Sequence, residues 1–223
     1  MIPAILVMGI GPILSWNKED ATKIFGKSFP SILLTTVISI IFFWIYRPYN
    51  MLGLVGIILA FWIISNVLLT LVPQLILKNK KFVQDNIPKY SNGMIIAHLG
   101  IALLILGITG SSIWQKEKII RMKVNDKTEI HNYNIVFKEI NKIAGPNYLA
   151  LQGNFWVYNK KKNIIAELKP ENRFYPVANN STTEVSIHTN LLRDLYIVLG
   201  EGDINEGWVV RIYYNPLVIW IWI

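Results

Sequence analysis

The chain has 223 residues, of which 52% are hydrophobic and 16% charged, and it contains no cysteine. Its mean hydropathy of +0.38 and its long apolar runs exclude an ordinary soluble domain. The absence of cysteine excludes a disulfide, a thiolate nucleophile and a thiolate metal site. The net charge of +8 needs no nucleic acid to explain it, because lysine-rich loops are usual in membrane proteins.

Four apolar runs in the first half of the chain indicate membrane spans. About 20 apolar residues cross a hydrocarbon layer of roughly 30 Å, and the longer runs reach that length. We expect helices at approximately 2–16, 31–46, 51–72 and 93–114. Pro30 would lie in the first turn of the second helix. Pro73 would end the third helix.

Both ends of the chain look truncated. The run 2–16 is short for a span and lacks the basic leader of a signal peptide. The run 216–223 stops after about two turns of what we expect to be a further transmembrane helix. The sequence is therefore expected to be either a fragment of a longer protein or one product of a divided gene.

Basic residues predict the orientation in the membrane. The two longer loops carry seven of them: Lys18, Lys23, Lys27, Lys78, Lys80, Lys81 and Lys89. The short turn between the second and third runs carries only Arg47. By the positive-inside rule, both longer loops face the cytoplasm or the matrix. Everything after Trp114 then lies in the periplasm or the intermembrane space.

The stretch 115–215 differs in kind from the runs before it. It holds 14 of the 22 basic residues and 11 of the 14 acidic residues, which indicates exposure to water. Short apolar and aromatic runs alternate with turn-forming groups. The expected strands are 119–124, 133–140, 148–152, 155–158, 164–168, 184–188, 194–199 and 208–214. We expect a small antiparallel β-domain, of which a compact barrel is one form, inserted into a membrane α-helical bundle of about four spans plus the start of a further one.

His98 is an ionisable residue inside the fourth apolar run. A neutral imidazole at that depth needs partners for its nitrogens, and intramembrane ionisable residues are usually functional. It could be a haem axial ligand, a proton relay or a hydrogen-bond partner of a quinone, or it could be bonded structurally to a neighbouring helix. Gly93, Gly100 and Gly107 recur every seven residues in the same run, which would let a helix or a flat ligand approach closely.

The outer domain offers weaker candidates. His131 is expected in a solvated turn, and neither it nor His188 has a carboxylate at metal-ligand spacing. Arg193 and Asp194 would form a structural ion pair, or face a partner together with Tyr196. No residue is identified as catalytic.

Several strings occur in an order found in one known family. They are Gly11-Pro-Ile-Leu-Ser-Trp16, Ala97-His98-Leu-Gly100-Ile-Ala102, Gly107-Ile-Thr-Gly-Ser-Ser112, Thr183-Glu184, Arg193-Asp194-Leu-Tyr196-Ile-Val-Leu-Gly200-Glu201 and Asn215-Pro-Leu-Val-Ile-Trp220-Ile-Trp222. From about residue 9 to its last residue, the chain thereby resembles the C-terminal part of CcmF, the large membrane subunit of the system I cytochrome c haem lyase.

The resemblance implies a function. CcmF-like proteins take haem from a haem chaperone outside the membrane and help attach it to the Cys-x-x-Cys-His thiols of apocytochrome c. They also hold a haem b between two membrane histidines, and His98 matches one of these. The resemblance therefore implies that His98 ligates haem b iron, with Gly100 allowing close approach of the haem or of a helix.

The chain also departs from the family pattern. It lacks the Trp-Trp-Asp segment that docks the substrate haem, the two external histidines that flank this segment, and the second membrane histidine. These features belong to the N-terminal part of the family. The chain is thus expected to be inactive alone and to need that part, together with the haem chaperone, the apocytochrome-binding subunit, apocytochrome c and membrane lipid.

Two other functions are alternatives to a role as a component of the haem lyase. One is a non-enzymatic membrane scaffold that recruits haem-delivery partners through the outer domain. The other is a transport subunit using His98 as a proton relay, which the absence of carboxylates in the spans disfavours. The host membrane would be the bacterial or the mitochondrial inner membrane.

Overall fold

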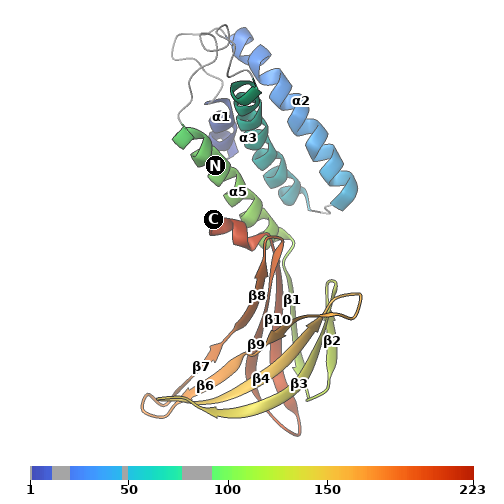
Figure 1. The fold of residues 1–223 in the computed structure, drawn as a ribbon, viewed down its shortest axis with the longest axis vertical. Coiled ribbons are helices and arrows are strands. Elements are labelled where there is room, and N and C mark those ends of the chain that lie inside the picture. The colour runs from blue at the N-terminus through green and yellow to red at the C-terminus, as the bar shows by residue number, and fades with distance from the viewer. Residues whose placement is uncertain (1, 12–20, 47–49, 77–91) are drawn as a thin grey trace. The chain divides into compact units, whose positions relative to one another are not determined.

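A computed structural model describes residues 2–11, 21–46, 50–76 and 92–223. The chain divides into two compact units, which we call the helical unit (1–113 with 220–223) and the β-unit (114–219). Figure 1 shows helices in the first and strands in the second. The assignment of individual helices as membrane spans stays a prediction.

The helical unit contains α1 (Ile2–Ile10), α2 (Ala21–Tyr46), α3 (Met51–Ile76) and α5 (Asn92–Ile113). Among the described residues, three helical segments are long and apolar enough to cross a membrane: Ile24–Trp44, Met51–Leu69 and Gly93–Ile113. Within the expected first span, α1 is nine residues long, and residues 12–16 of that span lie outside the described ranges.

Two proline predictions were wrong. α2 begins at Ala21, so Pro30 lies inside the helix rather than in its first turn. α3 continues to Ile76 instead of ending before Pro73. A proline removes one backbone N–H from the helical ladder, but neighbouring helices and hydroxyl side chains make this tolerable in transmembrane helices.

α3 contacts each of the other three described helices. A Cβ added to Gly56 would collide with the Thr109 side chain of α5, and one added to Gly9 of α1 would collide with the Trp62 ring. The Trp62 indole also donates to the Leu6 carbonyl at 3.1 Å. Small residues at these crossings allow the close backbone approach on which helix packing in lipid depends.

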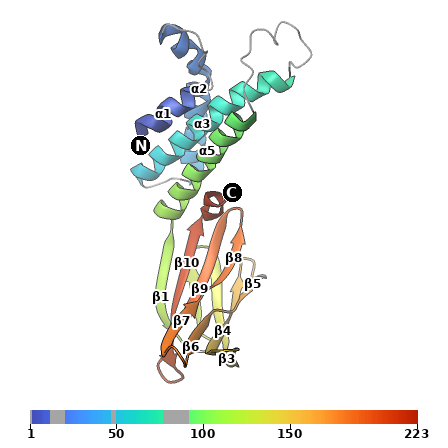
Figure 2. The ribbon, with the colours of Figure 1, turned by 90° about the vertical axis from the view of Figure 1, so that its left-hand side faces the viewer.

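The β-unit has ten antiparallel strands in two sheets. They are β1 (Lys116–Met122), β2 (Lys127–Ile130), β3 (Tyr133–Ala144), β4 (Leu149–Tyr158), β5 (Ile164–Leu168), β6 (Glu171–Tyr175), β7 (Asn180–Glu184), β8 (Ser186–Asn190), β9 (Arg193–Asp203) and β10 (Gly207–Pro216). The four-stranded sheet has the order β1-β10-β9-β8, visible in Figure 2. The six-stranded sheet has the order β2-β3-β4-β6-β7, and β5 pairs with β4.

The expected antiparallel β-domain is confirmed, as a curled sandwich of two sheets rather than a closed barrel. Its core lies between the sheets, where alternate side chains of β9 (Leu195, Ile197 and Leu199) meet Phe137 and Phe155. The two expected strands 148–152 and 155–158 are the single strand β4. Strands β2, β6 and β7 were missed. The final segment, expected to start an α-helix, forms a 3-10 helix at Val218–Ile221.

The sandwich has two distinct ends. At one end, Lys116 pairs with Tyr214 where the chain arrives from α5, and the β2–β3, β4–β5 and β8–β9 turns lie at the same end by strand register. We call it the Lys116 end. The opposite end carries the β9–β10 turn with Ile204, and we call it the Ile204 end.

Candidate functional site

His98 lies one and a half turns into α5 and is half-buried. Its Nδ1 is 2.7 Å from the Met94 carbonyl oxygen, one turn earlier. A carbonyl only accepts hydrogen bonds, so this contact places the imidazole proton on Nδ1 and leaves the Nε2 lone pair available. No hydrogen bond from Nε2 to another described residue is formed. Nε2 lies 4.0 Å from the position that a Cβ on Gly11 would occupy, which puts it beside the end of α1.

The sequence neighbours of His98 define its surroundings. Ile95 and Ala102, on the same side of α5, are buried against Trp62, Ile63 and Val67 of α3. His98 therefore borders the face of α5 that packs on α3.

Gly100 lies on a different side of α5. Residues two apart on an α-helix project roughly 200° from each other, so Gly100 does not share the side of His98. A Cβ added to Gly100 would meet no described atom within 4 Å. Gly100 thus faces open space among the described residues, with room for another backbone.

Arg193 is 2% exposed and belongs to a cluster at the Lys116 end. Its Nη1 donates to His188 Nδ1 and to the His188 carbonyl, both at 2.8 Å. Its Nε donates to the Tyr133 hydroxyl at 3.0 Å, and the guanidinium lies 4.5 Å from the centre of the Tyr133 ring. Burial, followed by the Arg193 charge, lowers the pKa of His188 below 6.5, which keeps Nδ1 free to accept.

Asp194 projects to the other face of β9 and, among the described residues, forms no ion pair with Arg193. Adjacent residues of a strand point to opposite faces, so the expected ion pair was geometrically disfavoured. One oxygen of Asp194 is buried without a hydrogen-bond partner in the described structure. Arg193 is structural in its contacts, and neither residue is placed in a catalytic arrangement.

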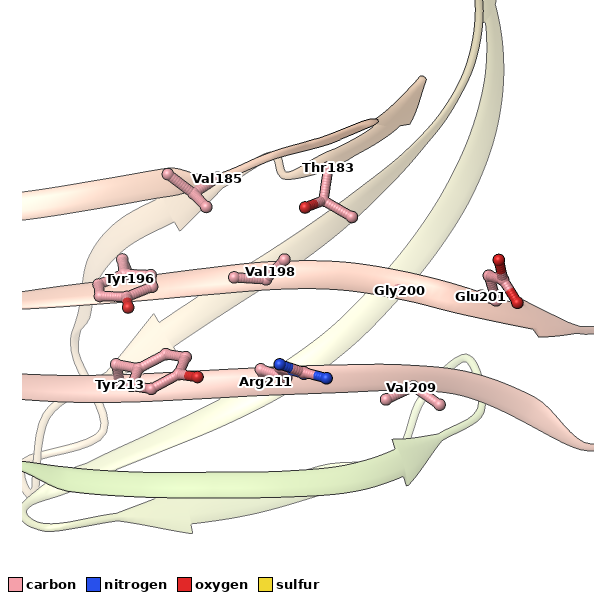
Figure 3. Close-up of a pocket in the computed structure, with 9 residues that line it drawn as sticks. All are labelled: Thr183, Val185, Tyr196, Val198, Gly200, Glu201, Val209, Arg211 and Tyr213. Atoms are coloured by element: carbon pink, nitrogen blue, oxygen red, sulfur yellow. The ribbon is translucent and has the colours of Figure 1, made fainter. Parts of the chain in front are cut away.

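Tyr196 lines a groove of about 520 Å³ on the outer face of the four-stranded sheet. Figure 3 shows Tyr196 beside Tyr213 and, farther along, Arg211 and Glu201. The two tyrosine rings stack with their centres 4.5 Å apart. A hydrogen bond from the Tyr213 hydroxyl to Glu117, followed by burial, raises the pKa of Tyr213. Burial, followed by the Glu117 charge, raises the pKa of Tyr196.

Sequence reasoning named Tyr196 but missed Tyr213, Arg211 and Glu117. The alternation Trp208 to Tyr214 contained the signal, because odd-numbered residues of that strand share one face. Which strand would lie beside β9 was not predictable from that alternation. Within the described ranges, no three His, Asp or Glu side chains gather in a way that could hold a metal ion.

The chain combines helices that are long and apolar enough to cross a membrane with an antiparallel β-sandwich. This combination is typical of a membrane protein that carries a β-sandwich domain. Residues 113–216 match the family model described as the CcmF C-terminal β-sandwich.

Relatives extend this likeness to the helices. The chain is 31% identical to the cytochrome c-type biogenesis protein CcmF of Escherichia coli, over all of this chain and 33% of that protein. It is also 31% identical to CcmF of Haemophilus influenzae, over all of this chain and 35% of that protein. A solved structure titled cytochrome c heme lyase CcmF shares the fold with a TM-score of 0.70 at 18% identity, covering 99% of this chain and 36% of that one.

The chain is a relative of the C-terminal portion of CcmF, and the resemblance predicted from its sequence strings is confirmed. It spans about a third of the length of the curated relatives that it matches.

Proposed function

We propose that this chain is a component of the cytochrome c haem lyase, and that it holds one axial position of a haem b in the membrane through His98 Nε2. The observation that carries the proposal is the Met94 carbonyl 2.7 Å from Nδ1. A ligating histidine normally donates its other ring N–H to a carbonyl or carboxylate, which fixes the tautomer and makes the ligating nitrogen more basic. The residues present therefore fit an imidazole-ligated haem.

The bound haem would supply one-electron chemistry. The work of this chain's own residues is structural and electronic. Met94 holds the imidazole proton at Nδ1, while the packing of Ile95 and Ala102 on α3 fixes the position of the ring.

Gly100 has a separate place in this proposal. Because its open side differs from that of His98, the geometry favours a helix there rather than the haem plane. We assign that helix to the N-terminal part of CcmF, on the same chain or on a separate subunit. That part would also supply the second haem ligand and the tryptophan-rich platform, so this chain would not be active alone.

The likeness to CcmF supports a proposed setting. The protein would be integral to the bacterial or mitochondrial inner membrane, with the β-unit in the periplasm or intermembrane space. Its partners would be apocytochrome c, the haem chaperone and the apocytochrome-binding subunit.

Loss of haem in His98→Ala is the first prediction. The full chain is co-expressed with the N-terminal part of CcmF, purified from membranes, and measured by its haem b optical spectrum. We expect the signal to fall several-fold in His98→Ala, since the protein then lacks one axial ligand. His131→Ala is the matched control, because His131 lies in an exposed turn of the β-unit. An unchanged spectrum in His98→Ala, or a loss equal in both variants, would overturn the ligand assignment.

A second candidate function rests on the groove beside Tyr196. Stacked tyrosines next to Arg211 and Glu201 on an outer sheet face offer apolar area together with both charge signs, as binding surfaces often do. On this alternative, the chain is a membrane scaffold that recruits haem-delivery partners, and His98 is packed structurally. Normal haem in His98→Ala, with loss of partner binding in Tyr213→Ala, would favour it.

A further inference from the structure

The Lys116 end of the β-unit carries an exposed apolar tip. The β8–β9 turn consists of Leu191 and Leu192, which are 60% and 71% exposed. The side chain of Asn190 holds the turn in shape by accepting from the Leu192 and Arg193 amides, both at 2.9 Å. Two leucines at the tip of a well-formed hairpin are costly in water, because each leaves a large apolar side chain hydrated.

Lysines share this end of the sandwich. The β4–β5 turn contributes Lys160, Lys161 and Lys162, all exposed, and β1 begins with the exposed Lys116. Lys116 and Lys160 both lie near His131 in the β2–β3 turn. The pKa of His131 is lowered first by burial and then by the charges of these two lysines. The Ile204 end carries both charge signs, since Asp203 and Glu206 lie there and Arg121 pairs with Glu206 at 3.0 Å.

Chain connectivity ties the Lys116 end to the apolar segments. Only Trp114 and Gln115 separate the end of α5 from Lys116. Even when fully extended, this connection spans about 10 Å. The tip is linked to the next apolar segment as well, because the Leu217 amide donates to the Leu192 carbonyl at 2.9 Å. If α5 crosses a membrane, this short connection keeps the Lys116 end within reach of the membrane surface.

We propose that the Leu191–Leu192 tip inserts into the interfacial layer of the bilayer, with Lys160 and Lys161 contacting anionic lipid headgroups. Apolar side chains buried at the headgroup boundary, supported by neighbouring lysines, are the usual composition of interfacial anchors. The anchor goes beyond haem ligation and does not depend on it. It would add a contact with the membrane to the covalent connections at the two ends of the β-unit.

The absence of cysteine makes a direct test available. Leu192→Cys and Ile204→Cys are prepared in the full chain, labelled with a nitroxide and reconstituted in vesicles of phosphatidylethanolamine and phosphatidylglycerol. Ile204 is the matched control, being an apolar residue 81% exposed in the hairpin turn at the opposite end of β9. Relaxation by oxygen, which partitions into lipid, is compared with relaxation by a water-soluble nickel chelate.

We expect the ratio of oxygen to nickel accessibility to be several-fold higher at Leu192 than at Ile204. Equal ratios at the two sites would overturn the proposal, because the tip would then lie in water. Protection of Leu192 from both reagents would overturn it as well, because protein rather than lipid would cover the tip. Far-UV circular dichroism matching that of the parent chain checks that both labelled variants are folded.

The lysines are tested in the same assay. In Lys160→Glu with Lys161→Glu, the ratio at Leu192 should fall in the phosphatidylglycerol vesicles and stay unchanged in vesicles of phosphatidylcholine alone. The control is the double variant Lys123→Glu with Lys127→Glu. These two lysines lie at the β1–β2 turn, away from the tip, and their substitution changes the charge by the same amount. An unchanged ratio with anionic lipid, or an equal fall in the control, would overturn the role of the lysines.

Discussion

The helical unit and the β-unit pack by different means. In the helical unit, small residues mark the closest approaches, at Gly56 against Thr109 and at Gly9 against Trp62. Large apolar side chains of α2, such as Phe29 and Trp44, point outward, exposed to 56% and 78%. In the β-unit, the large aromatic side chains Phe137, Phe155 and Trp208 are instead gathered in one buried core.

The solvent explains the difference. Between two helices in lipid, burying a leucine gains little, because the lipid is as apolar as the partner helix, so close packing of small groups and hydrogen bonds hold the helices together. In water, removing apolar surface is the main driving force. Substitutions that enlarge a residue should therefore damage the helical unit, and those that shrink one should damage the β-unit.

The largest effect is expected in the β-unit core from Phe137→Ala. The Phe137 ring is fully buried and stacks on Phe155 at a centre distance of 4.4 Å. Truncating such a residue leaves a cavity, and the free energy of unfolding of the β-unit should fall by about 3–5 kcal/mol. Pulse proteolysis in urea measures it. Ile164→Ala, at a position 53% exposed on β5, is the control and should cost far less.

A smaller loss is expected in the β-unit from Arg193→Met. The variant leaves His188 and Tyr133 without their donor in a buried place, at a cost of about 2 kcal/mol. Arg193→Lys should not recover the loss, because one ammonium cannot reproduce the guanidinium bonds to both partners and its stacking. Urea midpoints test both variants. Full recovery by lysine would contradict the geometry, and Arg211→Met, on the outer face of β10, should have little effect.

In the helical unit, adding one methyl group should be destabilising at Gly56 but not at Gly26. Gly56→Ala pushes α3 away from Thr109 of α5, and overpacking of this kind costs about 1–3 kcal/mol. Gly26→Ala adds the same group where no described atom lies within 4 Å. Both variants are heated in detergent, and the temperature at which half of the monodisperse protein is lost is compared between them. Equal midpoints would contradict the close approach of α3 and α5 at Gly56.

The smallest effect concerns pH and the β-unit alone. Burial lowers the pKa of His131 and of His188 below 6.5 in the folded protein. As pH falls through about 6.5, the unfolded chain takes up protons that the folded chain does not, so stability should decline. Urea midpoints between pH 7 and 5 should therefore decrease, and less steeply in His188→Asn. A midpoint independent of pH in the parent chain would refute the lowered pKa values.

Much of the fold was predictable because the relevant signals are local. The apolar run ending at Ile113 and the alternation in β9 are each readable within one element. Strands β2, β6 and β7 were missed because their sequences, such as Asn180–Glu184, are polar and are held by pairing with neighbouring strands.

The surroundings of the site residues were less predictable. His98 and its Met94 partner are one helical turn apart, a spacing visible in the sequence. Arg193 instead bonds Tyr133, which is 60 positions away, and only the sheet topology brings the two together. Asp194 was wrongly paired with Arg193 because adjacency in sequence places strand residues on opposite faces.

The pairing of Lys116 with Tyr214 brings the two ends of the sandwich side by side. Paired residues on neighbouring antiparallel strands lie about 5 Å apart, so the sandwich returns the chain almost to where it received it. Folding of the sandwich itself supplies the closure of a loop of nearly a hundred residues. The whole domain therefore connects the segments before and after it over a distance as short as that of a tight turn. A domain with neighbouring ends can be exchanged, shortened or duplicated while the chain before and after it stays in place.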